Sequence, residues 1–147
     1  MIKTIELTFH LEPVPKARSR VTAMKNGGMR SYTPERTQVA QLAFKQALVP
    51  YLQYRYPPHI ALKLTCIFYR TRTKWGLKRE QKPFRRADID NYTKLAMDSL
   101  SKGHSHKNTD DRYLIEDDAQ ITTLYTAKRW SDGQGYIKIR LEEDNDI

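Results

Sequence analysis

The stretch from Arg85 to Ser99 constrains the fold most, because a helix there would separate its polar and apolar residues onto two faces. Counted from Asp90 at 100° per residue, Lys94 lies at about 40°, Asp98 at about 80° and Asn91 at about 100°. The apolar residues occupy a separate arc of about 140–280° that can pack on a core: Tyr92, Leu95, Ala96 and Leu100. One face of this helix therefore packs, while the other gathers two carboxylates, an amide and an ammonium.

The polar face of this helix has two interpretations. If residues 88–90 are extended, the carboxylates of Asp88 and Asp90 point to the same side. Carboxylate oxygens in such a group suit a hard divalent cation such as Mg²⁺, which offsets their mutual repulsion. A surface helix that is capped by Asp88 or Asp90 and carries an i,i+4 pair between Lys94 and Asp98 explains the same residues. This stretch alone does not decide between the two.

A second acidic site, Glu116-Asp117-Asp118, stands just ahead of an apolar-alternating run. Its carboxylates are therefore expected at the entrance of a strand. Two acidic sites in one small domain favour a metal centre over a surface helix with a capping aspartate.

The order of these motifs resembles the RusA family of Holliday-junction resolvases. The residues that carry the resemblance are Asp88-Ile89-Asp90-Asn91, then Lys94 and Asp98, then Asp117-Asp118-Ala119-Gln120-Ile121. The segments Pro13-Val14-Pro15-Lys16-Ala17-Arg18-Ser19-Arg20 and Tyr32-Thr33-Pro34 are also similar to phage-type members of that family. The resemblance covers most of the chain, and the ordered combination is more specific than any single piece.

The resemblance implies a small, dimeric, Mg²⁺-dependent nuclease that cuts four-way DNA junctions, with Mn²⁺ as a substitute metal. Carried over position by position, the metal-binding aspartates are Asp88, Asp90 and Asp118, and the catalytic lysine is Lys94. Three further residues are additional candidates: Asn91, Asp98 and Asp117. The segment between Asp98 and Asp117 is longer than is usual in the family, so Asp117 stays an alternative to Asp118. We expect Asp118.

Positive charge is concentrated in one part of the chain. The first 97 residues carry 19 basic and 6 acidic side chains, whereas the last 50 carry 7 and 11. A basic body of this kind predicts a polyanionic partner, and nucleic acid is favoured over a membrane because no basic amphipathic helix accompanies the charge. A solvated, solubilising surface is the alternative. The expected DNA contacts are Lys16, Arg18, Arg20, Arg70, Arg72, Lys74, Arg85 and Arg86.

Length and composition limit the class of protein. A chain of 147 residues is long enough for one domain with a real core and too short for two to be expected. No apolar run approaches the roughly 20 residues that span a bilayer, and the charged, alternating start is not a signal peptide. A lone cysteine, Cys66, rules out an internal disulfide and fits a reducing cytoplasm.

Periodicity predicts a single α+β domain, with a mixed β-sheet and helices packed on it. Strands are expected over 5–9 and 61–69, and a hairpin over 120–141 with a glycine-containing loop. A helix is expected to start with Thr33 as cap and Pro34 in the first turn. Val39, Leu42, Ala43, Gln46 and Ala47 follow at helical spacing up to Pro50.

Three segments are expected to lie outside these elements. Residues 16–31 read as a mobile basic loop that contacts DNA or is a solvated connection. Residues 101–113 read as a flexible polar insertion, although His104 and His106 beside Asp110 and Asp111 could be a metal site. The acidic tail, 142–147, is expected to fray.

These observations favour a structure-selective, Mg²⁺-dependent DNA endonuclease in recombination and repair. A metal-dependent nuclease that acts on flaps or other branched DNA is the first alternative. A non-catalytic basic DNA-binding module, whose aspartates only cap a helix, is the second. The charge explains DNA binding in all three cases, and only the paired acidic sites separate the nucleases from the module.

Overall fold

A computed structural model describes residues 3–17, 20–32, 34–72, 82–83, 88–102 and 110–147. Its centre is a mixed sheet of four strands. Across the sheet the strands are β1 (Ile5–Phe9), β6 (Tyr136–Glu143), β4 (Leu62–Thr71) and β5 (Ile121–Ser131). The pairs β1–β6 and β6–β4 are antiparallel, while β4–β5 is parallel. The predicted α+β class is confirmed.

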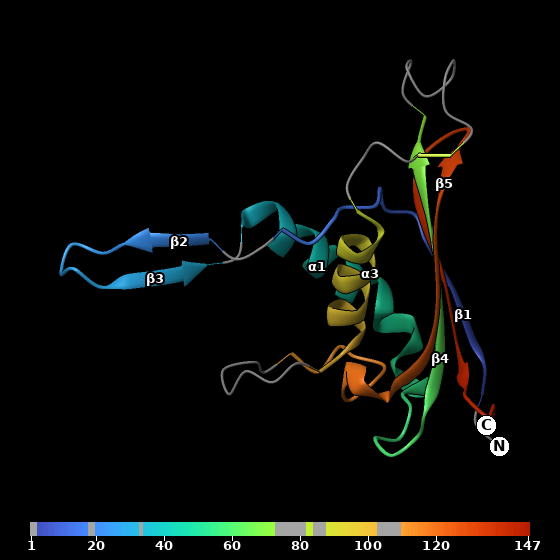
Figure 1. Ribbon diagram of the computed structural model, residues 1–147. Helices are drawn as coiled ribbons and strands as arrows, with labels where there is room; N and C mark the ends of the chain where they lie inside the picture. The colour runs from blue at the N-terminus through green and yellow to red at the C-terminus, as the bar shows by residue number, and fades with distance from the viewer. Residues whose placement is uncertain (1–2, 18–19, 33, 73–81, 84–87, 103–109) are drawn as a thin grey trace.

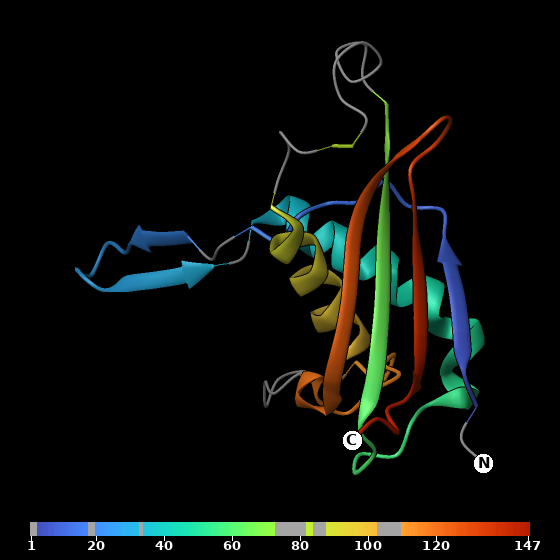
Figure 2. The same ribbon diagram turned by 45° about the vertical axis from the view of Figure 1, so that its right-hand side comes forward.

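Helices α1 (Glu35–Leu48) and α3 (Ile89–Leu100) lie on one face of the sheet. Figure 1 shows the sheet nearly edge-on with both helices on the same side, and Figure 2 shows the strands in front of them. A short 3₁₀ helix, η1 (Val49–Tyr54), continues α1, and another, η2 (Asp118–Gln120), leads into β5. This two-layer arrangement places α3 over the β4–β5 pair.

The core lies between the sheet and the helices. Alternate residues of the strands point into it, as the period-2 pattern predicts: Ile5, Leu7, Phe9, Leu62, Leu64, Cys66, Phe68, Ile137, Ile139 and Leu141 are all buried. Two ring contacts join the layers, with centroids 4.5 Å apart for Phe9–Phe44 and 5.5 Å apart for Phe68–Tyr92. Burying one such side chain stabilises the fold by about 1.5–3 kcal/mol.

The expected hairpin over 120–141 is wrong, because β4 lies between β5 and β6 in the sheet. The crossover from β4 through α3 makes β5 parallel to β4, as a connection that contains a helix permits. Strand β6 then fits antiparallel between β1 and β4. Residues 132–135 can pass over one strand because four extended residues span about 13 Å, whereas two strand spacings are about 10 Å.

The expected loop over 16–31 is also wrong in part. Strands β2 (Arg20–Ala23) and β3 (Met29–Tyr32) pair antiparallel as a ribbon that stands away from the helices (Figures 1 and 2). Its turn is closed by the Met24 N–H, which donates to the Gly28 carbonyl at 2.7 Å. Gly27 has a φ of +83°, a conformation that favours glycine. Each strand has only four residues, so the alternation of apolar and polar residues is too short to predict a strand from the sequence.

Helix α1 differs from the expectation at both ends and in its buried face. Thr33, the expected cap, lies outside the described residues, and Pro34 is the N-cap residue without a side-chain capping bond. The chain continues through Pro50 as η1 rather than stopping there. Of the residues at helical spacing, Val39 and Leu42 are 58% and 52% exposed. The buried side of α1 is instead formed by Thr37, Phe44 and Leu48.

The acidic tail does not fray at its start. Strand β6 extends to Glu143, and the Asp144 N–H donates to the Ala61 carbonyl at 2.8 Å. The Asp144 carboxylate accepts hydrogen bonds from the hydroxyls of Thr122 and Thr123, both at 2.6 Å. These three hydrogen bonds hold the tail against the entrances of β4 and β5.

The expected insertion over 101–113 is described only at its edges, and His104 and His106 lie outside the described residues. The described residues resume at Asp110, whose carboxylate forms a bidentate pair with the Arg112 guanidinium at N–O distances of 2.9 Å. Leu114 and Ile115 follow and are fully buried. No helix within the described ranges is long and apolar enough to span a bilayer.

Candidate active site

Helix α3 presents its polar face outward because its other face packs on the core and on β5. Tyr92, Leu95, Ala96 and Leu100 are buried, as the helical periodicity predicted. The Thr93 hydroxyl lies 2.8 Å from the Thr126 hydroxyl on β5 and 2.9 Å from the Ile89 carbonyl. Asp88 occupies the N-cap position, but its side chain makes no capping bond to the helix. Its carboxylate therefore stays available, like the exposed one of Asp90.

Lys94 joins the two acidic sites that the sequence indicated. Its Nζ lies 3.4 Å from Asp98 Oδ1 on the next turn of α3 and 3.6 Å from Asp118 Oδ2 at the start of η2. The negative charge of Asp98, with a smaller contribution from Asp118, raises the pKa of Lys94. The lysine side chain is 54% exposed. A protonated, accessible ammonium therefore stands between carboxylates from two separate elements.

The two neighbouring aspartates before β5 have different surroundings. The Asp117 carboxylate accepts the Ala119 N–H at 2.9 Å and caps η2. The Gln120 side chain completes this capping box by accepting the Asp117 N–H at 3.3 Å. It also accepts the Glu116 N–H at 2.9 Å and donates to the Pro57 carbonyl at 2.9 Å. Asp117 thus holds the turn, whereas Asp118 lies beside Lys94.

Lys16 belongs to this cluster, a relation that sequence analysis did not find. Its ammonium forms an ion pair with Asp98, and its backbone N–H donates to the Asn91 carbonyl at 2.9 Å. The next residue, Ala17, donates its N–H to the Thr37 hydroxyl on α1 at 3.2 Å. The sequence indicated Lys16 only as a basic residue of the Pro13–Arg20 motif and a DNA contact, and nothing in it indicated Asp98 as the partner.

A second missed residue, Lys45, supports the C-terminal end of α3. Its Nζ lies 3.2 Å from the carbonyls of Ser99 and Arg112 and 3.4 Å from that of Ser101. Burial lowers the pKa of Lys45, with Asp110 opposing that effect. A cation at the negative end of a helix dipole is favourable, so Lys45 fixes the helix that carries the acidic face.

The donor chemistry of this region suits a hard cation, because Asp88, Asp90 and Asp118 offer only oxygen ligands. Within the described residues, however, no three acidic, histidine or cysteine side chains are grouped closely enough to hold a metal ion. Asp118 and Asp98 are instead neutralised by Lys94. A bound metal would therefore require the side chains of Asp88, Asp90 and Asp118 to draw together.

The basic residues at the end of β4 lie near the start of α3. The guanidinium of Arg70 is 5.8 Å from the centre of the Tyr92 ring. Its Nε and Nη1 are buried with no hydrogen-bond partner among the described residues, as is Nε1 of Trp130, its register partner on β5. Arg72 Nε pairs with the exposed Asp132 at 3.2 Å. These buried N–H donors suit an anionic oxygen.

Several of the predicted DNA-contacting residues lie wholly or partly outside the part of the chain that the structure describes. Arg18, Lys74, Arg85 and Arg86 lie outside the described residues. Arg20 begins β2, and only its backbone is described. The structure therefore brings together Lys94, Asp98, Asp118 and Lys16. Asp90 stands about one turn before Lys94 on the same helix, and Asp88, the N-cap residue, stands a little under two turns before it.

A basic α+β domain with carboxylates and a lysine on one helix has the parts of a phosphodiester-cleaving nuclease. A family model described as endodeoxyribonuclease RusA matches residues 10–142, nearly the whole chain. The chain belongs to the RusA family of DNA endonucleases. A search of curated proteins found no match.

Proposed function

We propose that this protein is a Mg²⁺-dependent endonuclease that resolves four-way DNA junctions by paired, symmetric incisions during recombination or repair. The observation that carries the proposal is the position of Lys94 between Asp98 and Asp118, on the helix that also presents Asp88 and Asp90. Membership of the RusA family supports it. Mn²⁺ is expected to substitute for Mg²⁺, since both take oxygen ligands.

The proposed metal ligands are Asp88, Asp90 and Asp118. A divalent ion held there would supply an activated water and stabilise the charge that develops on the phosphate. Asn91, half-buried on the same helix, is a further polar group on this side. Asp117 is left out of the ligand set because its carboxylate caps η2.

Lys94 provides the positive charge of the site. Lys94 is protonated at neutral pH, and the charge of Asp98 raises its pKa further. Its exposure lets it reach a phosphate oxygen. A fixed cation at this point stabilises charge that grows in the transition state. Asp98 holds both Lys94 and Lys16 in place and acts as a positioning residue.

DNA binding is assigned to the basic residues around α3. Two N–H groups of Arg70 are buried and have no partner among the described residues, which is costly. A phosphate oxygen would satisfy them if the side chains that cover them move aside when DNA binds. Two copies of the chain, related by a two-fold axis, would present one site to each of two opposed strands of a junction.

The test is a cleavage panel in which junction, flap, single-stranded and linear duplex DNA share one sequence. With Mg²⁺ or Mn²⁺ we expect the junction to be cut far faster than the other substrates, and with a chelator we expect binding without cleavage. Equal cutting of flaps and junctions would favour the branched-DNA nuclease. Binding without metal-dependent cleavage of any substrate would favour the non-catalytic module.

A further inference from the structure

The β2–β3 ribbon has an apolar side that its own chain leaves exposed. The register pairs Ala23 with Met29 and Val21 with Ser31, so Val21, Ala23 and Met29 lie on one side of the ribbon. Val21 is 60% and Met29 69% exposed, and Met24 at the turn is 45% exposed. A two-stranded ribbon alone is marginally stable in water. This ribbon is therefore expected to gain a covering surface.

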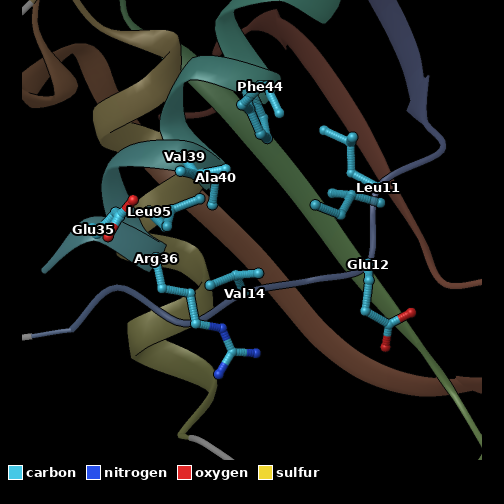
Figure 3. A pocket seen from close by; sticks show the side chains of 11 residues that line it. Leu11, Glu12, Val14, Glu35, Arg36, Val39, Ala40, Phe44 and Leu95 are labelled. Atoms are coloured by element: carbon cyan, nitrogen blue, oxygen red, sulfur yellow. The ribbon is translucent and has the colours of Figure 1, made fainter.

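An apolar groove of about 480 Å³ lies on the helical side of the molecule (Figure 3). Its walls come from the segment after β1, from α1 and from α3: Leu11, Val14, Val39, Ala40, Phe44 and Leu95. Val39 is 58% exposed there, on the side of α1 away from the core. The groove can accept aliphatic side chains of the size that the ribbon exposes.

The ribbon and the rim of the groove carry opposite charge. Residues 20–32 include three basic residues and no acidic one. Lys25 is exposed at the turn of the ribbon, whereas Arg20 and Arg30 alternate onto the side opposite Val21 and Met29. The groove is bordered by Glu12 and Glu35 with one arginine, Arg36. Opposite charges across an interface favour correct pairing and orientation.

The ribbon starts beside the groove of its own chain and extends away from it. Val14 lines the groove, and Lys16 and Ala17, just beyond it, are held on α3 and α1. Figure 1 shows the ribbon leaving the helices from this point. In a two-fold dimer each surface meets its counterpart on the other copy. Because the ribbon points outward from beside the groove, the ribbon of each copy can reach the groove of the other copy. We call this arrangement arm exchange.

We propose that the groove is filled by the β2–β3 ribbon of a second copy of this chain, with Val21 and Met29 against Val39 and Leu95. The inference rests on the proposed function in one respect, since it supplies the dimer that a symmetric cut requires. A four-residue strand spans about 13 Å. Each copy has one Lys16–Asp98 contact at the base of its ribbon. In the dimer these two contacts would lie about one ribbon length apart.

The first experiment is a cross-link between copies. Met29→Cys protein is mixed with Val39→Cys protein and oxidised after subunit exchange, so that only a bond between chains joins the two new thiols. Cys66 is fully buried and does not compete. Val49→Cys is the control partner, because Val49 is 51% exposed but lies in η1 and does not line the groove. We expect a covalent dimer with Val39→Cys and none with Val49→Cys.

The second experiment measures the dimer itself by sedimentation. The Val21→Asp/Met29→Asp double variant should dissociate at least about a hundredfold more readily, since two charges would enter an apolar groove. Its circular dichroism spectrum at 25 °C should match that of the wild type, because both side chains are exposed in one chain. Val49→Asp serves as the matched control and should stay dimeric.

The outcomes separate this inference from the proposed function. A monomeric wild type, or a double variant that stays dimeric, overturns the arm exchange. If that dimeric variant loses junction affinity, the ribbon contacts DNA instead. A wild-type dimer that cross-links as expected but cuts no junction supports the arm exchange and contradicts the proposed function.

Discussion

Lys94 Nζ lies 3.6 Å from Asp118 Oδ2, which links the middle of α3 to the turn before β5. The link follows from the topology, because the β4–α3–β5 crossover makes β5 parallel to β4 and places α3 over that pair. The Thr93–Thr126 hydrogen bond ties the neighbouring residue of α3 to β5 itself. Two acidic motifs far apart in sequence therefore meet through one lysine.

Removing the Asp90 carboxylate should stop cleavage and spare DNA binding. We expect Asp90→Asn to lower the cleavage rate by at least about a hundredfold, since loss even of a residue that supports a metal ligand costs 10–100-fold. Junction affinity should be equal or higher, because one negative charge near the phosphates is removed. Gel-shift titration in chelator and single-turnover cleavage in Mg²⁺ measure the two effects. Asp146→Asn, at the far end of the tail, is the control, and retained cleavage by Asp90→Asn at saturating Mg²⁺ would refute the ligand assignment.

Asp117 and Asp118 should give opposite phenotypes. Asp118→Asn is expected to lose cleavage and keep its melting temperature, because its carboxylate faces Lys94 rather than the backbone. Asp117→Ala should lose about 0.5–2 kcal/mol of unfolding free energy with its cap, and the folded fraction should still cut. Urea melts and cleavage assays on both variants decide this. Should folded Asp117→Ala be inactive while Asp118→Asn is active, the assignment must be reversed.

The elements with strong periodicity could be predicted from sequence. The residues from Leu62 to Phe68 alternate as a strand requires, and those from Asp90 to Leu100 are spaced as a helix requires. In both elements the buried residues are the ones that the periodicity predicts. The sheet order could not be predicted, because a short loop such as 132–135 suits a hairpin as well as a step over one strand. The β2–β3 ribbon was missed because four-residue strands rich in polar residues resemble a loop.

The polar face of α3 could be predicted as a candidate site, but its neighbours could not. Lys16 and Lys45 reach Asp98 and the end of α3 only through the tertiary fold, and sequence spacing carries no trace of either contact. The resemblance already favoured Asp118 over Asp117. The structure adds a physical reason for that choice, because the Asp117 carboxylate is used as a cap.

The basic residues at the end of β4 should control the salt dependence of DNA binding. If Arg70 and Arg72 contact phosphates, replacing both with glutamine should reduce the slope of log affinity against log salt by about one to two units. The change should be similar for DNA of any sequence, since phosphate contacts read no bases. Arg140→Gln, on the helix-free side of the sheet, is the matched control. An unchanged slope would mean that both arginines serve the fold alone.

Acid stability should depend on Asp110. Its bidentate hydrogen bonds with Arg112 lower the pKa of Asp110 from 3.8 to about 2. Because the folded pKa is depressed, this stabilisation is complete above the unfolded pKa of 3.8 and is lost as the pH falls toward about 2. Urea midpoints measured across that window should fall more steeply for wild type than for Asp110→Asn. Asp111→Asn, at the exposed neighbour, should follow wild type, and parallel curves for Asp110→Asn and wild type would contradict the role of the pair.

Mixed dimers test whether one junction needs two sites. Wild-type and Asp90→Asn chains carrying different tags can be allowed to exchange and purified as heterodimers. Because each strand is cut by one copy, a heterodimer should make one incision and then stall, leaving a nicked junction. Wild-type dimers should give two symmetric incisions, and the nicked duplex products should be sealed directly by a ligase. Denaturing gels of end-labelled junctions, with a cruciform plasmid that is linearised only by paired cuts, distinguish the two outcomes. A heterodimer that linearises the plasmid as fast as wild type would show that one active copy suffices, and the symmetric resolvase mechanism would fail.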